Sequence, residues 1–239
     1  MQKNKKYFLF LIVILLGVFS VFIVYQSHND KKLEQQGKVQ EKELYQAVSI
    51  ESEEQEENVV KNYQEKFNNT DIVGELSIEN TDLKVPVVKG DDNEYYLHHL
   101  LDKSTNELGS IFLDFRNNVT DRKILIYGHN SQDIYTEFHL LENYLNKSYY
   151  DEHKYITLKT ENDTYQYQIF TVYIAKTKLQ HVNLNFSDEE YSNHLKWLKS
   201  ESLYDTGVEI TGNDQILVLQ TCYFEIADSY VIIGAKKIN

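Results

Sequence analysis

The sequence predicts a mainly β domain with inserted helices, a closed barrel of about eight strands, preceded by a transmembrane helix and a polar helical stalk. Three observations support this prediction. Residues 7–25 carry no charged side chain, and residues 28–69 are strongly polar. Residues 70–239 contain short segments rich in Val, Ile, Tyr and Thr, bounded by Gly, Asn or Asp. We therefore divide the chain into a cytoplasmic tip and anchor (1–27), a stalk (28–69) and a folded domain (70–239).

The uncharged segment predicts a membrane anchor. At about 1.5 Å of rise per residue, residues 7–25 would span roughly 28 Å as a helix, close to the thickness of the bilayer core. Lys3, Lys5 and Lys6 precede the segment, so the positive-inside rule places the N-terminus in the cytoplasm. A cleaved signal peptide also fits this pattern, but no small-x-small cleavage site follows. We expect a single-pass protein of the cell membrane with an extracellular domain.

The stalk is rich in Glu, Gln, Asn and Lys, with an acidic run over residues 51–57. Such a composition predicts a solvated segment, either helical or disordered. Near its end, Val59, Val60, Tyr63 and Phe67 fall at helical spacing. They predict an amphipathic helix that packs on the following domain.

The folded domain has about 170 residues, enough for one core. The expected strands are residues 72–78, 83–88, 110–115, 123–127, 155–160, 165–176, 215–221 and 230–238. A helix is expected at 188–200, because Ser187 can cap it and acidic residues fill its first turn. Shorter helices are expected at 91–101 and 134–145.

Charge and missing motifs exclude several classes of function. The formal net charge of −13 argues against nucleic acid or an anionic membrane surface as partner. The chain has no Cys-x-x-Cys, no His-Glu-x-x-His and no glycine-rich phosphate loop. We therefore expect neither a metal nor a cofactor.

Cys222 is the only cysteine, and it follows a strand with four successive apolar residues, 216–219. In an exported chain a lone cysteine cannot form an internal disulfide. It is either a small buried core residue or a thiol kept for chemistry. A nucleophilic thiol needs a basic partner.

His129 is the best candidate for that partner. It ends a second apolar strand, 124–127, directly after Gly128. The other seven histidines fall in helices, loops or the stalk and are interpreted as surface or packing residues. By itself His129 is equally compatible with a structural role.

Together these features resemble a sortase, a cysteine transpeptidase of Gram-positive bacteria. The resemblance rests on the anchor, on Tyr-Gly-His-Asn at 127–130 and on Leu-Gln-Thr-Cys at 219–222, about 90 residues later. Five features resemble class B: Asp-Asp-Asn-Glu-Tyr-Tyr-Leu at 91–97, Phe-Leu-Asp-Phe-Arg-Asn at 112–117, Tyr-Gly-His-Asn at 127–130, the helix expected at 188–200, and the N-terminal helix expected near residues 59–67. The match extends from about residue 72 to the end.

The resemblance implies a sortase β-barrel and a chemistry. Cys222 would attack a C-terminal sorting signal after its Thr, and His129 would act as general acid and base. The acyl group would pass to an amine of a lipid-linked peptidoglycan precursor or a pilin. By analogy Asn93, Thr221 and Gln220 would line the substrate groove, with the loop before residue 188. Surface proteins or pilins carrying a sorting signal would be the partners.

One position departs from the family. Eight residues after the cysteine, at the start of the last strand, the family carries an arginine that binds substrate and stabilises the oxyanion; here it is Tyr230. The chain's two arginines, Arg116 and Arg122, lie elsewhere in the sequence. Tyr230 is either a neutral hydroxyl donor at the site or an ordinary strand tyrosine. Gln220 also replaces the serine usual in class B.

The departure leaves alternatives open. The same enzyme could anchor proteins to the wall or polymerise pilins. A catalytically weakened sortase-fold protein that only binds sorting signals is the alternative that Tyr230 motivates. A general cysteine protease lacks support, because no papain-like or caspase-like cysteine context is present.

Overall fold

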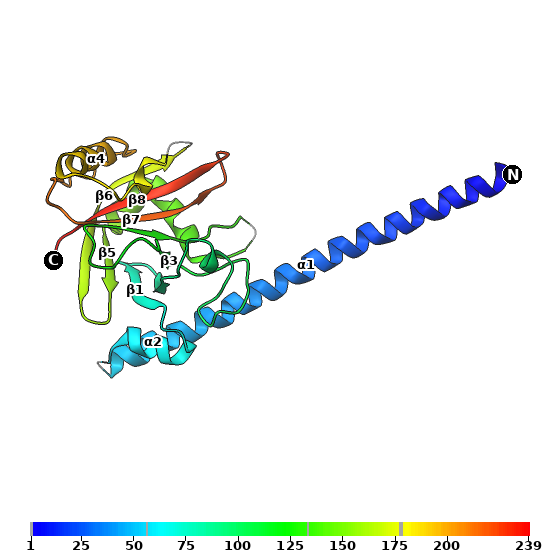
Figure 1. Ribbon diagram of the computed structural model, residues 1–239, viewed down its shortest axis with the longest axis horizontal. Helices are drawn as coiled ribbons and strands as arrows, with labels where there is room; N and C mark the ends of the chain where they lie inside the picture. The colour runs from blue at the N-terminus through cyan, green and yellow to red at the C-terminus, as the bar shows by residue number, and fades with distance from the viewer. Residues whose placement is uncertain (1, 56, 133, 177–178) are drawn as a thin grey trace.

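Eight strands close into a barrel (Figure 1). The computed structural model describes residues 2–55, 57–132, 134–176 and 179–239, without the side chains of residues 2–15 and 18. The barrel order is β1-β2-β3-β4-β7-β8-β6-β5. The strands are β1 (Ile72–Ile78), β2 (Lys84–Val88), β3 (Phe112–Leu113), β4 (Lys123–Tyr127), β5 (Tyr155–Lys159), β6 (Thr164–Ala175), β7 (Ile216–Tyr223) and β8 (Ser229–Lys237). The predicted barrel is confirmed.

The pairing of β4 with β7 matters most for the site. These strands run parallel, and their register ends with Tyr127 opposite Gln220. The segments that follow each strand therefore leave from the same edge of the barrel. On the other side of β7, strand β8 runs antiparallel and sets Tyr230 opposite Cys222.

Strand β7 is covered on both faces, which explains its continuous apolar run. Leu217 and Leu219 belong to the barrel interior. Ile216 and Val218 face a second cluster built with α4 (Asp188–Ser200). A strand buried on both faces has no reason to alternate polar and apolar residues.

The predicted helix at 188–200 is confirmed by α4, which begins at a reciprocal capping box between Ser187 and Glu190. The helix expected at 91–101 is wrong in extent: only a 3₁₀ turn forms, η1 (Tyr95–Leu97). The Asp92 side chain accepts the first amides of this turn, and a bridge between His99 and Thr105 then folds the chain back. Between the barrel strands lie three further helices: η2 (Glu137–Leu145), α3 (Lys147–Glu152) and η3 (Gln180–Val182).

The strand expected at 110–115 is also shorter than predicted. It holds only the two residues of β3, because Asp114 turns the chain outward. The Asp114 side chain accepts the amide of Arg116, and its carbonyl accepts the amide of Asn117. This turn brings the side chain of Arg116 into the region described below.

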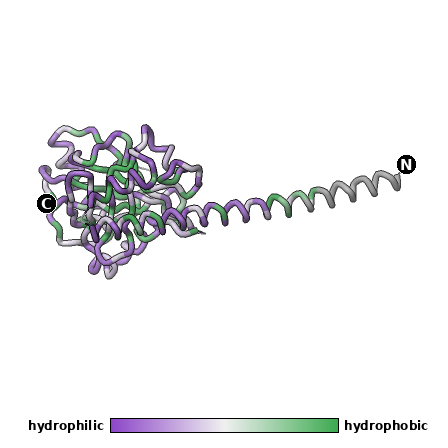
Figure 2. The backbone as a smooth tube through the Cα atoms, turned by 90° about the horizontal axis from the view of Figure 1, so that it is seen from below, coloured by the Kyte–Doolittle hydropathy of each residue, from purple (hydrophilic) through white to green (hydrophobic). Residues whose placement is uncertain are grey.

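The N-terminal helix α1 (Gln2–Glu54) runs continuously through the expected anchor and stalk and extends far beyond the barrel (Figure 1). Its hydropathy changes along its length, from a polar part near the barrel to an apolar part further out (Figure 2). Among the described residues, no helix is long and apolar enough to cross a membrane. Residues 7–15 and 18 of the expected anchor fall outside the described side chains, so the anchor stays a prediction.

The expectation of a solvated stalk is wrong for the last turns of α1. Lys38, Tyr45, Ser49 and Ser52 are buried against the barrel. The expected amphipathic helix is confirmed as α2 (Val59–Phe67), whose predicted apolar residues are all buried. Packing of α1 on α2 and β2, and of α2 on β1, supplies the apolar partner that the composition of the stalk does not reveal.

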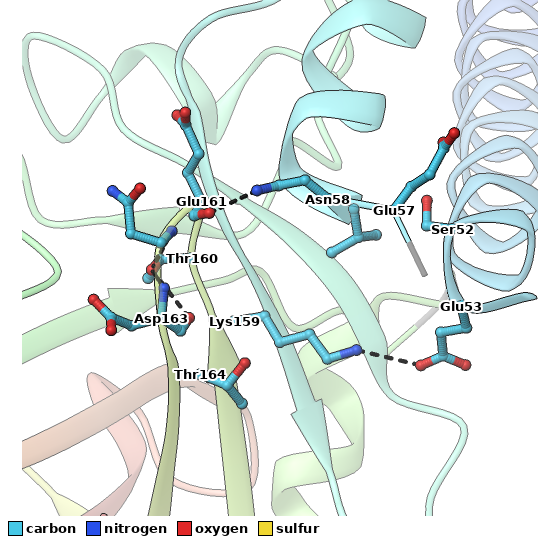
Figure 3. A pocket seen from close by; sticks show the side chains of 11 residues that line it. Ser52, Glu53, Glu57, Asn58, Lys159, Thr160, Glu161, Asp163 and Thr164 are labelled. Atoms are coloured by element: carbon cyan, nitrogen blue, oxygen red, sulfur yellow. Dashed lines mark hydrogen bonds and ion pairs between the residues drawn. The ribbon is translucent and has the colours of Figure 1, made fainter. Parts of the chain in front are cut away.

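Polar contacts close the junction between α1 and α2. Figure 3 shows Lys159, from β5, reaching Glu53 near the end of α1, and Asn58 donating to the carbonyl of Glu161 in the β5–β6 turn. Asn58 is also the N-cap of α2. The junction therefore fixes both helices to the hairpin.

Candidate active site

The ends of β4 and β7 are held together by side chains as well as by the sheet. The Thr221 hydroxyl donates to the carbonyl of Gly128 at 2.9 Å, and the Asn130 amide donates to the carbonyl of Cys222 at 2.9 Å. Gly128 has no room for a side chain, because a Cβ would collide with Ile111 and Phe138. This packing explains the glycine before the histidine.

All six residues predicted for the site line one cleft with a volume of about 460 Å³. They are Asn93, His129, Gln220, Thr221, Cys222 and Tyr230. They come from the turn before η1, the end of β4, the end of β7 and the start of β8. Segments far apart in the sequence thus contribute to one cavity, as an enzyme site requires.

Cys222 is partly buried at the end of the cleft-lining strand. Burial raises the pKa of its thiol above the ordinary value of 9.0. At physiological pH the side chain is therefore a neutral thiol, and such a thiol needs a base to become nucleophilic.

His129 has a defined tautomer. Its Nε2 lies 2.8 Å from the carbonyl oxygen of Leu97, and a carbonyl can only accept a hydrogen bond. Nε2 therefore carries the proton, and Nδ1 is the basic nitrogen of the neutral ring. Burial lowers the pKa of His129 below 6.5, although the Leu97 contact opposes this change. The resting imidazole is neutral at physiological pH.

The network that holds the Cys222 carbonyl was not predicted from the sequence. Asn130 is buried, donates to Glu142 and to Cys222, and contacts Nδ1 of His139 through Oδ1 at 2.8 Å. His139 and Glu142 both belong to η2. In the sequence, this network is indicated only by the Asn that follows His129 in the family motif. The motif does not show which groups this Asn contacts.

Arg116 is the main residue that sequence reasoning missed. It lines the same cleft as Cys222 and Tyr230, although it lies in the turn after β3. Its guanidinium binds Asp114 through Nε at 2.8 Å and Nη2 at 2.7 Å, and Nη2 also donates to the carbonyl of Val182. The site therefore contains an arginine, which comes from the turn after β3 and not from the start of β8, where the family carries it.

Asp114 holds the Arg116 guanidinium in place. It is fully buried and also accepts from the Asn93 amide and the Tyr127 hydroxyl. Burial alone would raise its pKa, but these donors hold the pKa below its usual value of 3.8. The Asp114 carboxylate thus stays charged and fixes Asn93 and Arg116 at the cleft.

Gln220 is held by a histidine that the sequence suggested was only a packing residue. Nε2 of His181 lies 2.6 Å from Oε1 of Gln220, so the ring nitrogen donates to the amide oxygen. Behind His181, the buried Lys123 donates to the carbonyls of His181 and Asn183 and contacts His194. Burial lowers the pKa of Lys123 to about 7 and that of His181 to about 4.

Arg122, the other arginine, lies away from this cleft. It stacks on the ring of Tyr191 at 3.6 Å and pairs with Asp188. Within the described residues, no three His, Cys, Asp or Glu side chains are grouped to hold a metal ion.

Comparison with known proteins gives consistent matches. The model of the sortase domain family matches residues 76–238. Sortase B of Staphylococcus aureus is 31% identical over 97% of both chains. A Staphylococcus aureus sortase B–substrate complex superposes with a TM-score of 0.76 at 30% identity, covering 85% of this chain and 97% of the other. A mutant form of Clostridium perfringens sortase B gives a TM-score of 0.72 at 32% identity, covering 80% of this chain and 92% of the other.

Proposed function

Because the chain belongs to the sortase family, as a class B cysteine transpeptidase, we propose that it cleaves a C-terminal sorting signal after Thr and transfers the acyl group to an amine. The acceptor is an amino group of a peptidoglycan precursor or of a pilin. The observation that carries this proposal is the meeting of Cys222 and His129 in one cleft at the tied ends of β4 and β7.

The reaction follows from the protonation states of the two groups. Sγ of Cys222 attacks the Thr carbonyl carbon while Nδ1 of His129 takes the thiol proton, which is possible because Nε2 already holds the proton shared with Leu97. The C–N bond then breaks, and the imidazolium gives its proton to the leaving amine. The thioester is resolved when the acceptor amine attacks, loses a proton to His129 and releases the thiol.

The developing oxyanion needs hydrogen-bond donors. Tyr230, opposite Cys222, can offer a neutral hydroxyl, and Arg116 offers guanidinium N–H groups from the facing side of the cleft. Arg116 is already oriented by Asp114, so little rotamer entropy is lost when it binds substrate.

Three further residues are proposed to contact or arrange the signal. Gln220 presents its amide nitrogen to the signal, because its oxygen is engaged by His181. Both ends of the Asn93 side chain are already bonded, to Asp114 and to the amide of Phe115, so its role is to order the cleft wall. Thr221 likewise uses its hydroxyl to tie β7 to Gly128.

Thioester trapping tests the proposal. The full-length chain in detergent is incubated with a library of sorting-signal peptides, and its intact mass is measured. We expect an acyl adduct on wild type and none on Cys222→Ala, with a nearly unchanged thermal transition in the variant. Full cleavage by Cys222→Ala would contradict the assignment.

The alternative is a sortase-fold protein that binds signals without efficient turnover. It is motivated by Tyr230 at the family's arginine position. Trapping separates the two proposals, because a binding protein retains the peptide without forming a thioester.

We also propose that residues 7–25 anchor the chain in the cell membrane, with the domain outside. The uncharged run and the lysines before it support this topology. Protease added to protoplasts should digest the domain and leave a short membrane-bound fragment. Protection of the domain would contradict the topology.

A further inference from the structure

A buried ion cluster fastens α1 to the barrel. Lys38 is 4% exposed, and its ammonium lies 2.9 Å from Glu41 on the same helix and 3.5 Å from Glu137 of η2. Burial alone would lower the pKa of Lys38, but the two carboxylates outweigh it and raise the pKa above 10.5. Burying a charged group costs free energy that is offset only by well-placed partners.

The same ammonium reaches the segment that holds His129. Lys38 donates to the carbonyl of Gly109 at 2.7 Å, and Glu41 accepts the amide of Leu101. Gly109 has a φ of +55° and packs directly on the Leu97 carbonyl, since a Cβ there would lie 2.5 Å from that oxygen. The Leu97 carbonyl is the acceptor for Nε2 of His129. Gly109 therefore lies between the Lys38 ammonium and the Leu97 carbonyl, and this carbonyl sets the tautomer of His129.

The cluster also grips the segment that follows His129. Glu137 opens η2, and Tyr45 of α1 donates to it at 3.1 Å. Two residues later, His139 contacts Asn130, the neighbour of His129. The helix thus contacts the chain both before and after the His129 imidazole, at Gly109 and at Glu137.

We propose that Lys38 is a positioning residue for transpeptidation: by docking α1 on Gly109 and Glu137, it holds the Leu97 carbonyl against Nε2 of His129. This inference rests on the function proposed above. It makes α1 part of the catalytic apparatus as well as a tether. Because Lys38 does not line the cleft, its removal should change turnover and leave substrate binding nearly intact.

The test compares Lys38→Met with Lys42→Met in the full-length chain in detergent. Lys42 lies one helical turn further along α1, is partly exposed and contacts the exposed side chain of Tyr135. It therefore controls for the loss of a lysine from α1. Two quantities are measured at a temperature at which both variants are folded by circular dichroism. The first is the steady-state kinetics of transpeptidation, expressed as kcat relative to KM, and the second is the tautomer of the His129 ring from its ¹⁵N chemical shifts.

For Lys38→Met we expect kcat lower by at least about tenfold with KM changed less than about twofold, because a displaced base costs rate and not binding. The neutral His129 ring should change from the Nε2–H form to a mixture of tautomers. Lys42→Met should match wild type in both measurements. If Lys38→Met keeps the wild-type tautomer, or the wild-type kcat, the proposal is wrong.

Two further outcomes are separated by the same experiment. If Lys38→Met does not fold, Lys38→Met/Glu137→Gln removes the ammonium together with one of its two carboxylate partners and takes its place. If neither variant folds, Lys38 serves the fold as a whole and the proposal is wrong. If wild type itself forms no thioester, the proposed function fails, whereas the tautomer comparison can still be read.

Discussion

Two buried lysines support the walls of the cleft: Lys38 contacts the segment that holds His129, and Lys123 contacts the segment that holds Gln220. Different partners determine the pKa values of the two lysines. Lys38 and Lys123 are equally buried, at 4% and 3% exposed. Lys38 sits between two carboxylates, and its pKa is raised. Lys123 contacts two carbonyls and His194, and burial together with the nearby Arg116 lowers its pKa to about 7.

The comparison shows that partners, and not depth, decide whether a buried lysine keeps its charge. On the His129 side, the two carboxylates beside Lys38 keep its ammonium charged at physiological pH. On the Gln220 side, Lys123 holds the carbonyls of His181 and Asn183 and titrates close to neutrality. One side of the cleft is therefore fixed by ion pairs, and the other depends on pH.

The largest expected effect lies on the fixed side, at its reactive group. His129→Ala should lower kcat by at least about 10²-fold, because general acid–base catalysis contributes at least that much. His99→Ala is the control, since His99 is partly exposed and stacks on Tyr95 outside the cleft. Steady-state transpeptidation kinetics measure both. An active His129→Ala with an inactive His99→Ala would mean that the wrong imidazole is paired with Cys222.

The next largest effect concerns Arg116, whose Nη2 binds both the Asp114 carboxylate and the Val182 carbonyl. Arg116→Gln should lower kcat/KM by about 10²-fold, the usual cost of losing an oxyanion donor. Arg122→Gln removes the chain's other arginine from a stack on Tyr191 and should keep wild-type kinetics. Equal losses in the two variants would point to net charge instead of a role in the cleft.

A smaller effect is expected at Tyr230. If its hydroxyl donates to the oxyanion, Tyr230→Phe should lower kcat/KM by about tenfold, equivalent to about 1.4 kcal/mol. Tyr230→Arg should then retain or raise activity where the cleft admits the longer side chain. A silent Tyr230→Phe, with Tyr230→Arg activating a nearly inert wild type, would favour the signal-binding alternative.

The two reacting groups also predict the pH profile of kcat/KM. Below the pKa of His129 the imidazolium cannot take the thiol proton, and above the pKa of Cys222 no proton remains for the leaving amine. Burial lowers the first pKa from 6.5 and raises the second from 9.0. We therefore expect a bell whose limbs fall below pH 6.5 and above pH 9.0. A profile narrower than this interval would contradict the two effects of burial.

The sequence predicted the barrel and the placement of Cys222 and His129 at one cleft because their signals are local. Apolar runs mark strands, and a lone Cys222 and His129 end two of them. The position of Arg116 in the cleft was not predicted, because it depends on the turn at Asp114 and on the ion pair between the two side chains. The docking of α1 was not predicted for the same reason. From the sequence alone Lys38 and Glu41 resemble solvated stalk residues, whereas in the structure both are buried and Lys38 binds the carbonyl of Gly109.

The smallest effect is on stability, and it tests the lysine comparison directly. Stability depends on pH wherever folded and unfolded states bind different numbers of protons. Lys38 has a raised folded pKa, so its contribution is fully present below pH 10.5 and is lost only above it. Lys123 has a folded pKa of about 7, so the unfolded state binds the extra proton between about pH 7 and 10.5, and its contribution becomes more favourable as pH rises through that range.

Urea unfolding of wild type, Lys38→Met and Lys123→Met at about pH 6, 7, 8 and 9 measures this difference. The free energy of unfolding of wild type minus that of Lys38→Met should stay flat across the series. The corresponding difference for Lys123→Met should be flat up to about pH 7 and then rise by at most about 1.4 kcal/mol per pH unit, the limit for one proton. Groups that do not interact with the mutated lysine cancel in these differences. A flat line for Lys123 would mean that its two carbonyl acceptors keep the ammonium charged, and the two sides of the cleft would then be equally insensitive to pH.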